Sequence, residues 1–275
     1  MDIAALFQQP NALPTAPKVV QDLISSFNDE KISAEAIARK LAADPVLSAK
    51  LLRLANSAYY HASHTISTVN EAVAMLGFVT VRTLVISSGL VNGFKSAPGL
   101  DLKQFWRYSL NTAVTAKWLA RHLEENSDLA FTLGMTHAIG QLVIHAGMPE
   151  QAMTLDKDVP PLDARRLEVE RKAFGYDYAA VGAELASRWK FPEIFSALIG
   201  TCQEPMQTTP FQPMAGILHL SAWFARAVEN RLTTQESKAS FPAEVASALG
   251  ISPALMLEEM PSLTELSAGL EELIT

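Results

Sequence analysis

Apolar residues recur at steps of three and four along most of this chain, and no segment alternates apolar and polar residues convincingly over the length of a strand. The spacing of Val20, Leu23 and Ile24 within residues 16–27 is typical of one apolar helix face. The β-branched run at residues 79–81 lies inside a longer stretch with helical spacing. The sequence therefore predicts an all-α protein whose helices pack in pairs around a shared core.

Helix start and stop signals divide the chain into segments. Ser33 is typical of a helix N-cap, Asp44 precedes a first-turn proline at Pro45, and Gly77 separates two helical stretches. The weakest joints are Gly93–Gly99 and residues 203–213, and the first could separate two helical lobes. Besides the helix that follows Pro45, the expected helices cover residues 16–27, 34–43, 69–76, 78–92, 101–124, 128–146, 162–174, 178–189, 192–201, 212–230, 241–249 and 261–273.

Composition and charge exclude several classes of protein. With 49% hydrophobic and 19% charged residues, the chain is too apolar to be largely disordered. A formal net charge of −7 gives no overall attraction to nucleic acid or to anionic lipid. The densest basic cluster, within residues 165–172, is interleaved with acidic residues, as on a solvated helix face. The sequence therefore argues against a nucleic-acid partner.

The sequence also bears on the compartment. The N-terminal residues lack a basic region followed by a long apolar stretch, so no secretory signal is predicted. Two stretches without charged residues, 129–149 and 205–225, contain glycines, prolines and polar residues and are interpreted as buried helices. The single cysteine, Cys202, cannot form an internal disulfide or a cysteine zinc cluster. We expect a cytoplasmic protein without a membrane contact.

The C-terminal part, residues 231–275, differs from the rest in charge. Lys238 is its final basic residue, and the sequence predicts an acidic helical extension. This extension could pack on its own domain, or it could be a dimerisation or partner-binding helix, which leaves a homo-oligomer open. The unbalanced acidic residues are Glu244, Glu258, Glu259, Glu265, Glu271 and Glu272, and the leucines on one helix face are Leu263, Leu266, Leu270 and Leu273.

Known catalytic and phosphate-binding motifs are absent from the sequence, including the P-loop, GxGxxG, HExxH, GxSxG and EF-hand patterns. His61 and His64 have no nearby cysteine or carboxylate, so they make a poor metal site. His137 lies in a strongly apolar helical stretch, where a histidine is usually a hydrogen-bonded core residue. Neither Ser87 nor Cys202 has a visible base and orienting group.

Several short phrases occur in a set order and spacing over about residues 11 to 205. They are found at residues 13–14 (Leu-Pro), 44–58 (beginning Asp-Pro-Val-Leu-Ser), 66–77 (Ile-Ser-Thr-Val to Leu-Gly), 105–110 (Phe-Trp-Arg-Tyr-Ser-Leu), 131–140, and 181–192 (Val-Gly-Ala-Glu-Leu to Phe-Pro). Together they resemble the HDOD family, a bacterial regulatory branch related to the HD metal-dependent phosphohydrolases.

The resemblance implies a two-lobed, all-helical HDOD domain over residues 11–230. A smaller N-terminal lobe would cover residues 11–95, an HD-like bundle would cover 100–230, and 231–275 would be the extension. Regulatory or signalling roles are usual in the family, often beside two-component or cyclic-di-nucleotide systems. The implied partners are therefore signalling proteins.

The sequence departs from the HD pattern at the positions that hold the metal. HD hydrolases use a histidine, an adjacent His-Asp pair and a later aspartate, because carboxylates balance the charge of a divalent cation. In this chain the first histidine position is Tyr108, and the pair reads His137-Ala138. Two further family histidine positions are Tyr178 and Cys202, and residues 219–223 contain no carboxylate in place of the distal aspartate. We therefore expect no metal, no cofactor and no catalytic residue at these degenerate positions.

The sequence leaves three functions open. The leading hypothesis is a non-catalytic bacterial signal-transduction module that binds a protein or small ligand. Its suspected partner surface is the uncharged segment with Tyr59, Tyr60 and His64, although these residues could equally pack on their lobe. The alternative is a metal-dependent phosphohydrolase of the HD superfamily with rearranged ligands, which would need Asp177 or Glu184 to reach His137. A nucleic-acid binder is the third class.

Overall fold

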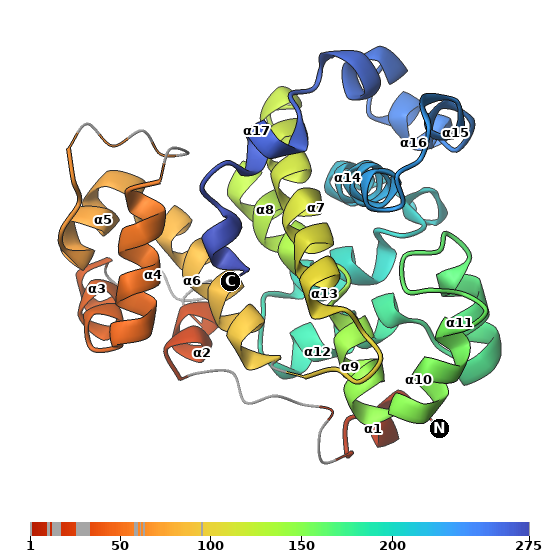
Figure 1. Ribbon diagram of the computed structural model, residues 1–275, viewed down its shortest axis with the longest axis horizontal. Coiled ribbons are helices and arrows are strands. Elements are labelled where there is room, and N and C mark those ends of the chain that lie inside the picture. Colours follow the sequence, from red (N-terminus) through yellow and green to blue (C-terminus); the bar gives the residue numbers. More distant parts are fainter. Residues whose placement is uncertain are drawn as a thin grey trace.

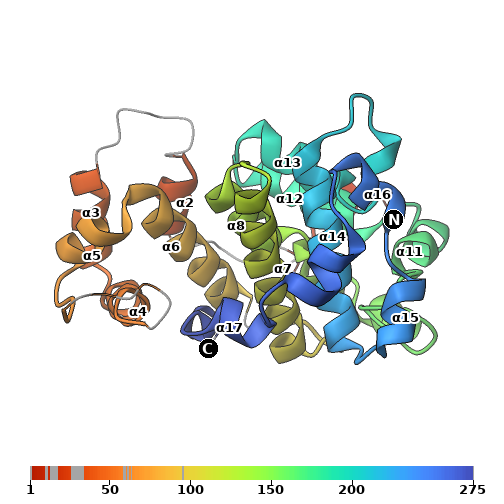
Figure 2. The same ribbon diagram turned by 90° about the horizontal axis from the view of Figure 1, so that it is seen from above.

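Helices supply the regular secondary structure throughout the described part of the chain, which confirms the predicted all-α fold (Figure 1). The computed structural model describes residues 2–9, 12, 18–25, 34–57, 60, 62, 64–94 and 96–274. A small group of helices lies at one end of the molecule and a larger bundle at the other (Figure 2). The fold thus has the two lobes that the sequence predicts.

Two helices of the smaller lobe begin with strong N-terminal caps. The Asp44 side chain accepts two backbone N–H groups at 3.0 Å, and Thr68 and Glu71 form a reciprocal capping box. At Gly77 the chain bends by 116° between two helices, and the second leaves the lobe to pack against the bundle. The helices are α2 (Lys18–Ser25), α3 (Ala34–Ala42), α4 (Pro45–Ala55), α5 (Val69–Leu76) and α6 (Phe78–Gly93).

The bundle is built around its longest helix, α7, which packs most extensively against α8 and α14. A second layer pairs α12 with α9 and α13. The chain begins on this bundle, where Leu6 of α1 (Ile3–Leu6) is fully buried beside Gly147. The bundle helices are α7 (Leu102–His122), α8 (Ser127–Thr136), α9 (Ile139–Gly147), α10 (Pro149–Asp156), α11 (Arg166–Phe174), α12 (Tyr178–Arg188), α13 (Glu193–Thr201) and α14 (Pro213–Glu229), with a 3-10 turn, η1 (Pro205–Gln207).

The predicted single helix over residues 128–146 is wrong at its centre, because His137 and Ala138 separate α8 from α9. Ring Nδ1 of His137 lies 2.7 Å from the carbonyl oxygen of Gly134. In a continuous helix that oxygen would accept the N–H of Ala138. The side chain therefore takes over a backbone acceptor, and the break holds His137 inside the bundle, where it is fully buried.

Gly140 allows α9 and α12 to approach each other closely just after this break. A Cβ atom at Gly140 would overlap the carbonyl oxygen of Tyr178 and crowd the backbone nitrogen of Gly182. Any larger residue would push the helices apart. The contact therefore sets Tyr178, the first residue of α12, beside the interrupted segment.

The stretch of residues 127–147 is long and apolar enough to cross a membrane, and the bent pair α5–α6 also passes that test if it is counted as one span. In the stretch at 127–147, 89% of the apolar window is buried inside the fold. The interpretation of residues 129–149 as buried helical structure is confirmed, although two helices share the stretch.

The C-terminal extension packs across both groups of helices, so the predicted continuous helix over 261–273 is wrong. Within the extension, α16 packs on α14 and α17 packs on α7. The chain then turns at Gly269, which has a φ of +81° that most residues avoid. Leu270 and Leu273 are fully buried in the segment that contacts α4 and α6. The elements are α15 (Thr234–Ala239), α16 (Ala243–Ala248), the π-helical turn η2 (Leu255–Glu259), α17 (Leu263–Ser267) and the 3-10 turn η3 (Glu271–Leu273).

Candidate functional site

A buried polar cluster occupies the place where the bundle helices converge on the α8–α9 break. Ring Nε2 of His137 lies 3.0 Å from the hydroxyl of Tyr108 on α7, and the two rings meet edge to face at 5.1 Å. Tyr178 and Cys202 are also buried and interact electrostatically with Tyr108. The fold thus brings together four positions that the sequence singles out, and Ala138 lies buried beside them.

These four side chains are uncharged at neutral pH. Burial lowers the pKa of His137 to about 4, although its bond to Gly134 opposes the shift. Burial raises the pKa of the Cys202 thiol to about 12, and it raises the pKa values of Tyr108 and Tyr178 as well. A neutral His137 donates from Nδ1 to Gly134, so Nε2 accepts the hydroxyl proton of Tyr108. Both ring nitrogens are therefore occupied.

The charged member of the cluster is Arg226, a residue that the sequence reasoning missed. Its half-buried side chain comes from α14 and interacts with the hydroxyl groups of Tyr108 and Tyr178. On the same helix, ring Nδ1 of His219 lies 3.0 Å from the carbonyl oxygen of Cys202. Arg226 stands seven residues after His219, so the two share a helix face. The signal was a lone arginine that follows the charge-free stretch 205–225.

A second buried cluster fixes the start of α12, which carries Tyr178. Arg166 is almost completely buried, and its guanidinium bonds Glu170 and Asp156 at 2.6 Å each and the Val159 carbonyl at 2.7 Å. The other carboxylate oxygen of Glu170 accepts the backbone N–H of Tyr178 at 2.7 Å. Burial raises the pKa of Glu170 to about 7, whereas the neighbouring Arg166 opposes that shift. The cluster therefore positions Tyr178 through its backbone.

Comparison with protein families decides the relationship. The HDOD domain model matches residues 13–205, which is most of the chain. The chain belongs to the HDOD family.

Solved structures agree with this HDOD assignment. A provisionally named phosphohydrolase from Shewanella amazonensis SB2B is 33% identical, with a TM-score of 0.79 over 98% of this chain and 97% of that one. An HDOD domain protein with unknown function from Geobacter sulfurreducens is 26% identical, with a TM-score of 0.74 over 95% and 93%. An uncharacterized protein of Treponema pallidum (strain Nichols) is 25% identical over 199 residues, 69% of this chain, which spans 37% of that protein's length.

The residues of this HDOD chain do not fit the divalent metal of HD hydrolases. A hard cation needs carboxylates, but the cluster offers phenols, a thiol held protonated and one imidazole, His137, whose two ring nitrogens are occupied. The guanidinium of Arg226 would also repel the cation. Within the described ranges, no three His, Cys, Asp or Glu side chains come together in a way that could hold a metal ion.

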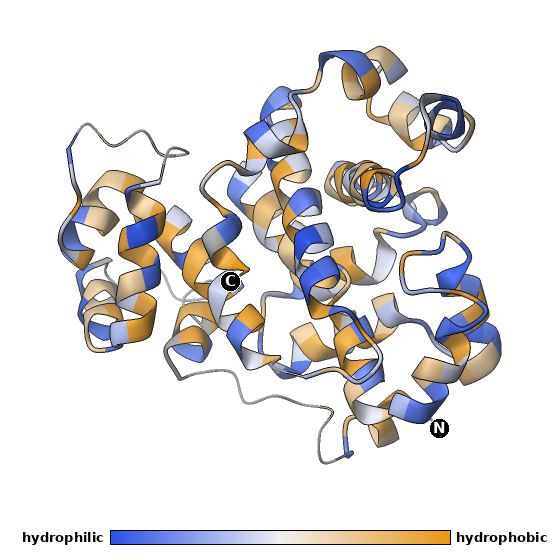
Figure 3. Cartoon of the chain, in the orientation of Figure 1, coloured by the Kyte–Doolittle hydropathy of each residue, from blue (hydrophilic) through white to orange (hydrophobic). Residues whose placement is uncertain are grey.

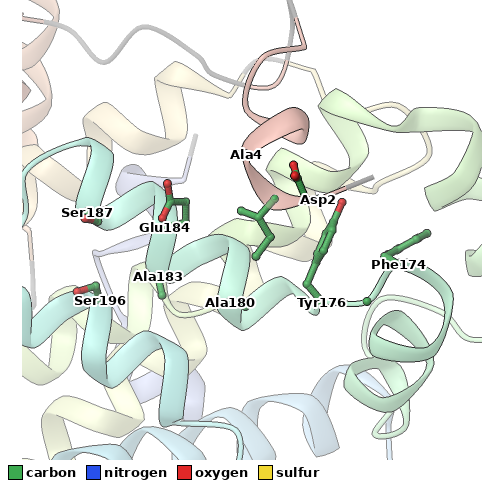
Figure 4. Close-up of a pocket in the computed structure, with 11 residues that line it drawn as sticks. Asp2, Ala4, Phe174, Tyr176, Ala180, Ala183, Glu184, Ser187 and Ser196 are labelled. Atoms are coloured by element: carbon green, nitrogen blue, oxygen red, sulfur yellow. The ribbon is translucent and has the colours of Figure 1, made fainter.

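The two carboxylates that could replace lost ligands are bound elsewhere. Asp177 caps α12 by accepting the N–H of Ala180 at 2.8 Å, and it pairs with Arg171. Glu184 pairs with Arg188 at 2.7 Å and lines a different groove, of about 990 Å³, between α1 and the α12–α13 pair (Figure 4). Neither acid contributes to the electrostatic environment of His137.

The suspected partner surface is only partly visible in the HDOD fold. Tyr59 lies outside the described residues. Tyr60 is half-buried and packs against the core, whereas His64 is exposed. Neither residue lies on the bundle helices that build the cluster at His137. Figure 3 colours the described residues by hydropathy, and both groups of helices contain apolar and polar stretches.

Proposed function

We propose that this HDOD protein is a non-catalytic signal-transduction module that acts by binding a protein or a small ligand. One observation carries the proposal. The cluster at the HD-related position has a permanent cation, Arg226, and otherwise neutral groups. Such a set lacks the carboxylates and the open coordination position that metal-assisted phosphoester hydrolysis requires.

The partners follow from this role and from the family. We propose a signalling protein of the cytoplasm, of the kind found beside two-component or cyclic-di-nucleotide systems. The proposal is supported by the family membership and by the helices that pack against one another around the altered cluster. Because the chain spans 37% of its Treponema pallidum relative, the activity of that whole protein carries no weight here.

A metal-dependent phosphohydrolase with rearranged ligands is the competing function. It is favoured by the provisional phosphohydrolase name of the 33% identical Shewanella amazonensis protein. In this chain it would require Asp177 or Glu184 to leave an arginine partner and move to His137. Such a move would leave the guanidinium group of Arg171 or Arg188 without that carboxylate, and it would place a metal cation beside the guanidinium of Arg226.

Elemental analysis of protein purified without a chelator tests the proposal, together with hydrolysis of bis(p-nitrophenyl) phosphate in the presence of Mn²⁺, Ni²⁺ or Mg²⁺. We expect no stoichiometric metal and no turnover above the no-enzyme rate. A stoichiometric metal with turnover would overturn the proposal. In that event the variants Asp177→Asn and Glu184→Gln, compared with Glu150→Gln on exposed α10, would identify the acid that had moved.

A further inference from the structure

The charged end of the buried cluster opens onto a groove. This groove, of about 600 Å³, is lined by α11, the 203–204 turn, α14 and the start of the C-terminal extension. Its wall includes Arg226, His219 and Gln203, so it begins where the cluster at Tyr108 ends. A volume of this size suits a small-molecule ligand.

The groove has a cation without an acidic partner among the described residues, in an otherwise acidic protein. Three arginines line it, Arg165, Arg171 and Arg226, but the first two are neutralised by bound carboxylates, which leaves Arg226 as the available charge in a chain of net −7. Local positive charge of this kind in a concave surface attracts anions even when the whole protein repels them.

The three arginines differ in their partners. Arg165 is held by both carboxylate oxygens of Asp163, at 3.0 and 2.7 Å, and Arg171 pairs with Asp177 and Glu204. Among the ion pairs within the described residues, none involves Arg226. Its neighbours are the two neutral tyrosines, and the closest acid in electrostatic terms, Asp163, is already bound. The guanidinium of Arg226 is therefore available to pair with a bound anion.

We propose that this groove binds a small phosphate-bearing anion on the guanidinium of Arg226. A guanidinium binds a phosphoryl group through two parallel N–H donors. The Tyr108 hydroxyl also interacts with the guanidinium of Arg226. A doubly charged phosphoryl group gains more from the charge of Arg226 than a singly charged carboxylate does. This inference rests on the proposed binding role and adds the class of ligand. It depends on that role because a resident metal ion would repel the guanidinium of Arg226 from the site.

Isothermal titration of the full chain tests the inference with two probes, inorganic phosphate and AMP, and with sodium acetate at matched ionic strength as the control anion. We expect saturable binding of at least one phosphate probe and none of acetate. Tight AMP binding with weak phosphate binding identifies an ester as the ligand, and the reverse identifies free phosphate. Absence of saturable binding for both probes would refute the inference.

Variants locate the site. Arg226→Gln is expected to weaken phosphate binding by about tenfold or more, and Arg226→Lys by less, since it keeps the charge but loses the paired donors. The matched control, Arg188→Gln, removes an arginine that pairs with Glu184 and does not line this groove, so it should leave binding unchanged. If Arg226→Gln is poorly folded, the NMR shift of His219 in the unaltered protein must still move on phosphate addition.

The outcomes separate this inference from the proposed function. Stoichiometric metal with hydrolysis overturns both. Metal-free, inactive protein that binds neither phosphate nor AMP overturns the ligand class alone. Unchanged affinity in Arg226→Gln places any bound anion elsewhere and also rejects the inference.

Discussion

Two arginines lie within the same helical bundle in opposite chemical surroundings. Arg166 has two carboxylates and a carbonyl within 2.7 Å, whereas Arg226 faces the hydroxyls of Tyr108 and Tyr178. The first charge is neutralised by the protein itself, so its role is to hold helices together. The second is left for something outside the chain. The difference teaches that a buried charge indicates function only after its partners have been counted.

Removing the guanidinium of Arg166 should be the most damaging change. Arg166→Leu leaves Glu170 and Asp156 without their cation in a buried place, which costs about 3–5 kcal/mol of unfolding free energy. Arg226→Gln leaves neutral neighbours behind and should cost about 1 kcal/mol. Urea denaturation of both variants measures the gap. Equal losses would erase the contrast between the two arginines, and Arg165→Gln, which breaks an exposed pair, is the control.

Acid should act on the cluster through His137. The folded protein binds a proton at His137 only near pH 4, whereas the unfolded chain does so near pH 6.5. The unfolded state therefore holds more protons between these values, and stability falls as the pH drops through that window. The fall attributable to this residue reaches about 3 kcal/mol.

Stability measured from pH 7 to pH 4 in the native protein and in His137→Gln checks this effect. In the variant, the free energy of unfolding should lose the part of its pH dependence that comes from His137. The part that comes from His145 and His219 should remain, because burial lowers their pKa values as well. An NMR titration of His137 with a midpoint near pH 6.5 would contradict the prediction.

The sequence predicts the helices well because their apolar spacing is local information. It misses features that depend on contacts made by folding. The break at His137 arises when a ring nitrogen takes the carbonyl of Gly134, and apolar spacing continues through it. Arg226 could not be predicted, because the family pattern marks a carboxylate position on α14 and no local pattern shows that a charge lacks a partner. Tyr108 and Tyr178 were found because the family pattern marks their positions.

Tyr108→Phe is a milder test of the neutral cluster. The change leaves Nε2 of His137 as a buried acceptor without a donor, so we expect a loss of about 1–2 kcal/mol. Tyr176→Phe, whose hydroxyl reaches only the Met148 sulfur at 3.5 Å, should cost less. Urea denaturation of the two variants gives the comparison. A larger loss at Tyr176 would show that the bond to His137 contributes little.

The smallest effect is expected at the pair Glu184–Arg188. This pair joins adjacent turns of one helix near the surface, so Glu184→Gln should change unfolding free energy by about 0.3–0.5 kcal/mol. Metal content should not change. A marked loss of stability or a change in bound metal would mean that Glu184 serves the cluster after all.

The end of the chain has a mechanical consequence. After the chain has crossed α7, Leu270 and Leu273 are buried in the segment that packs against α4 and α6. These residues therefore connect the bundle back to the smaller lobe. Changing the angle between the lobes would expose these leucines to water, which costs about 1.5–3 kcal/mol of free energy for each leucine. A domain fused after residue 274 would be attached directly to this segment, so its movement would change the angle between the two lobes of the HDOD unit.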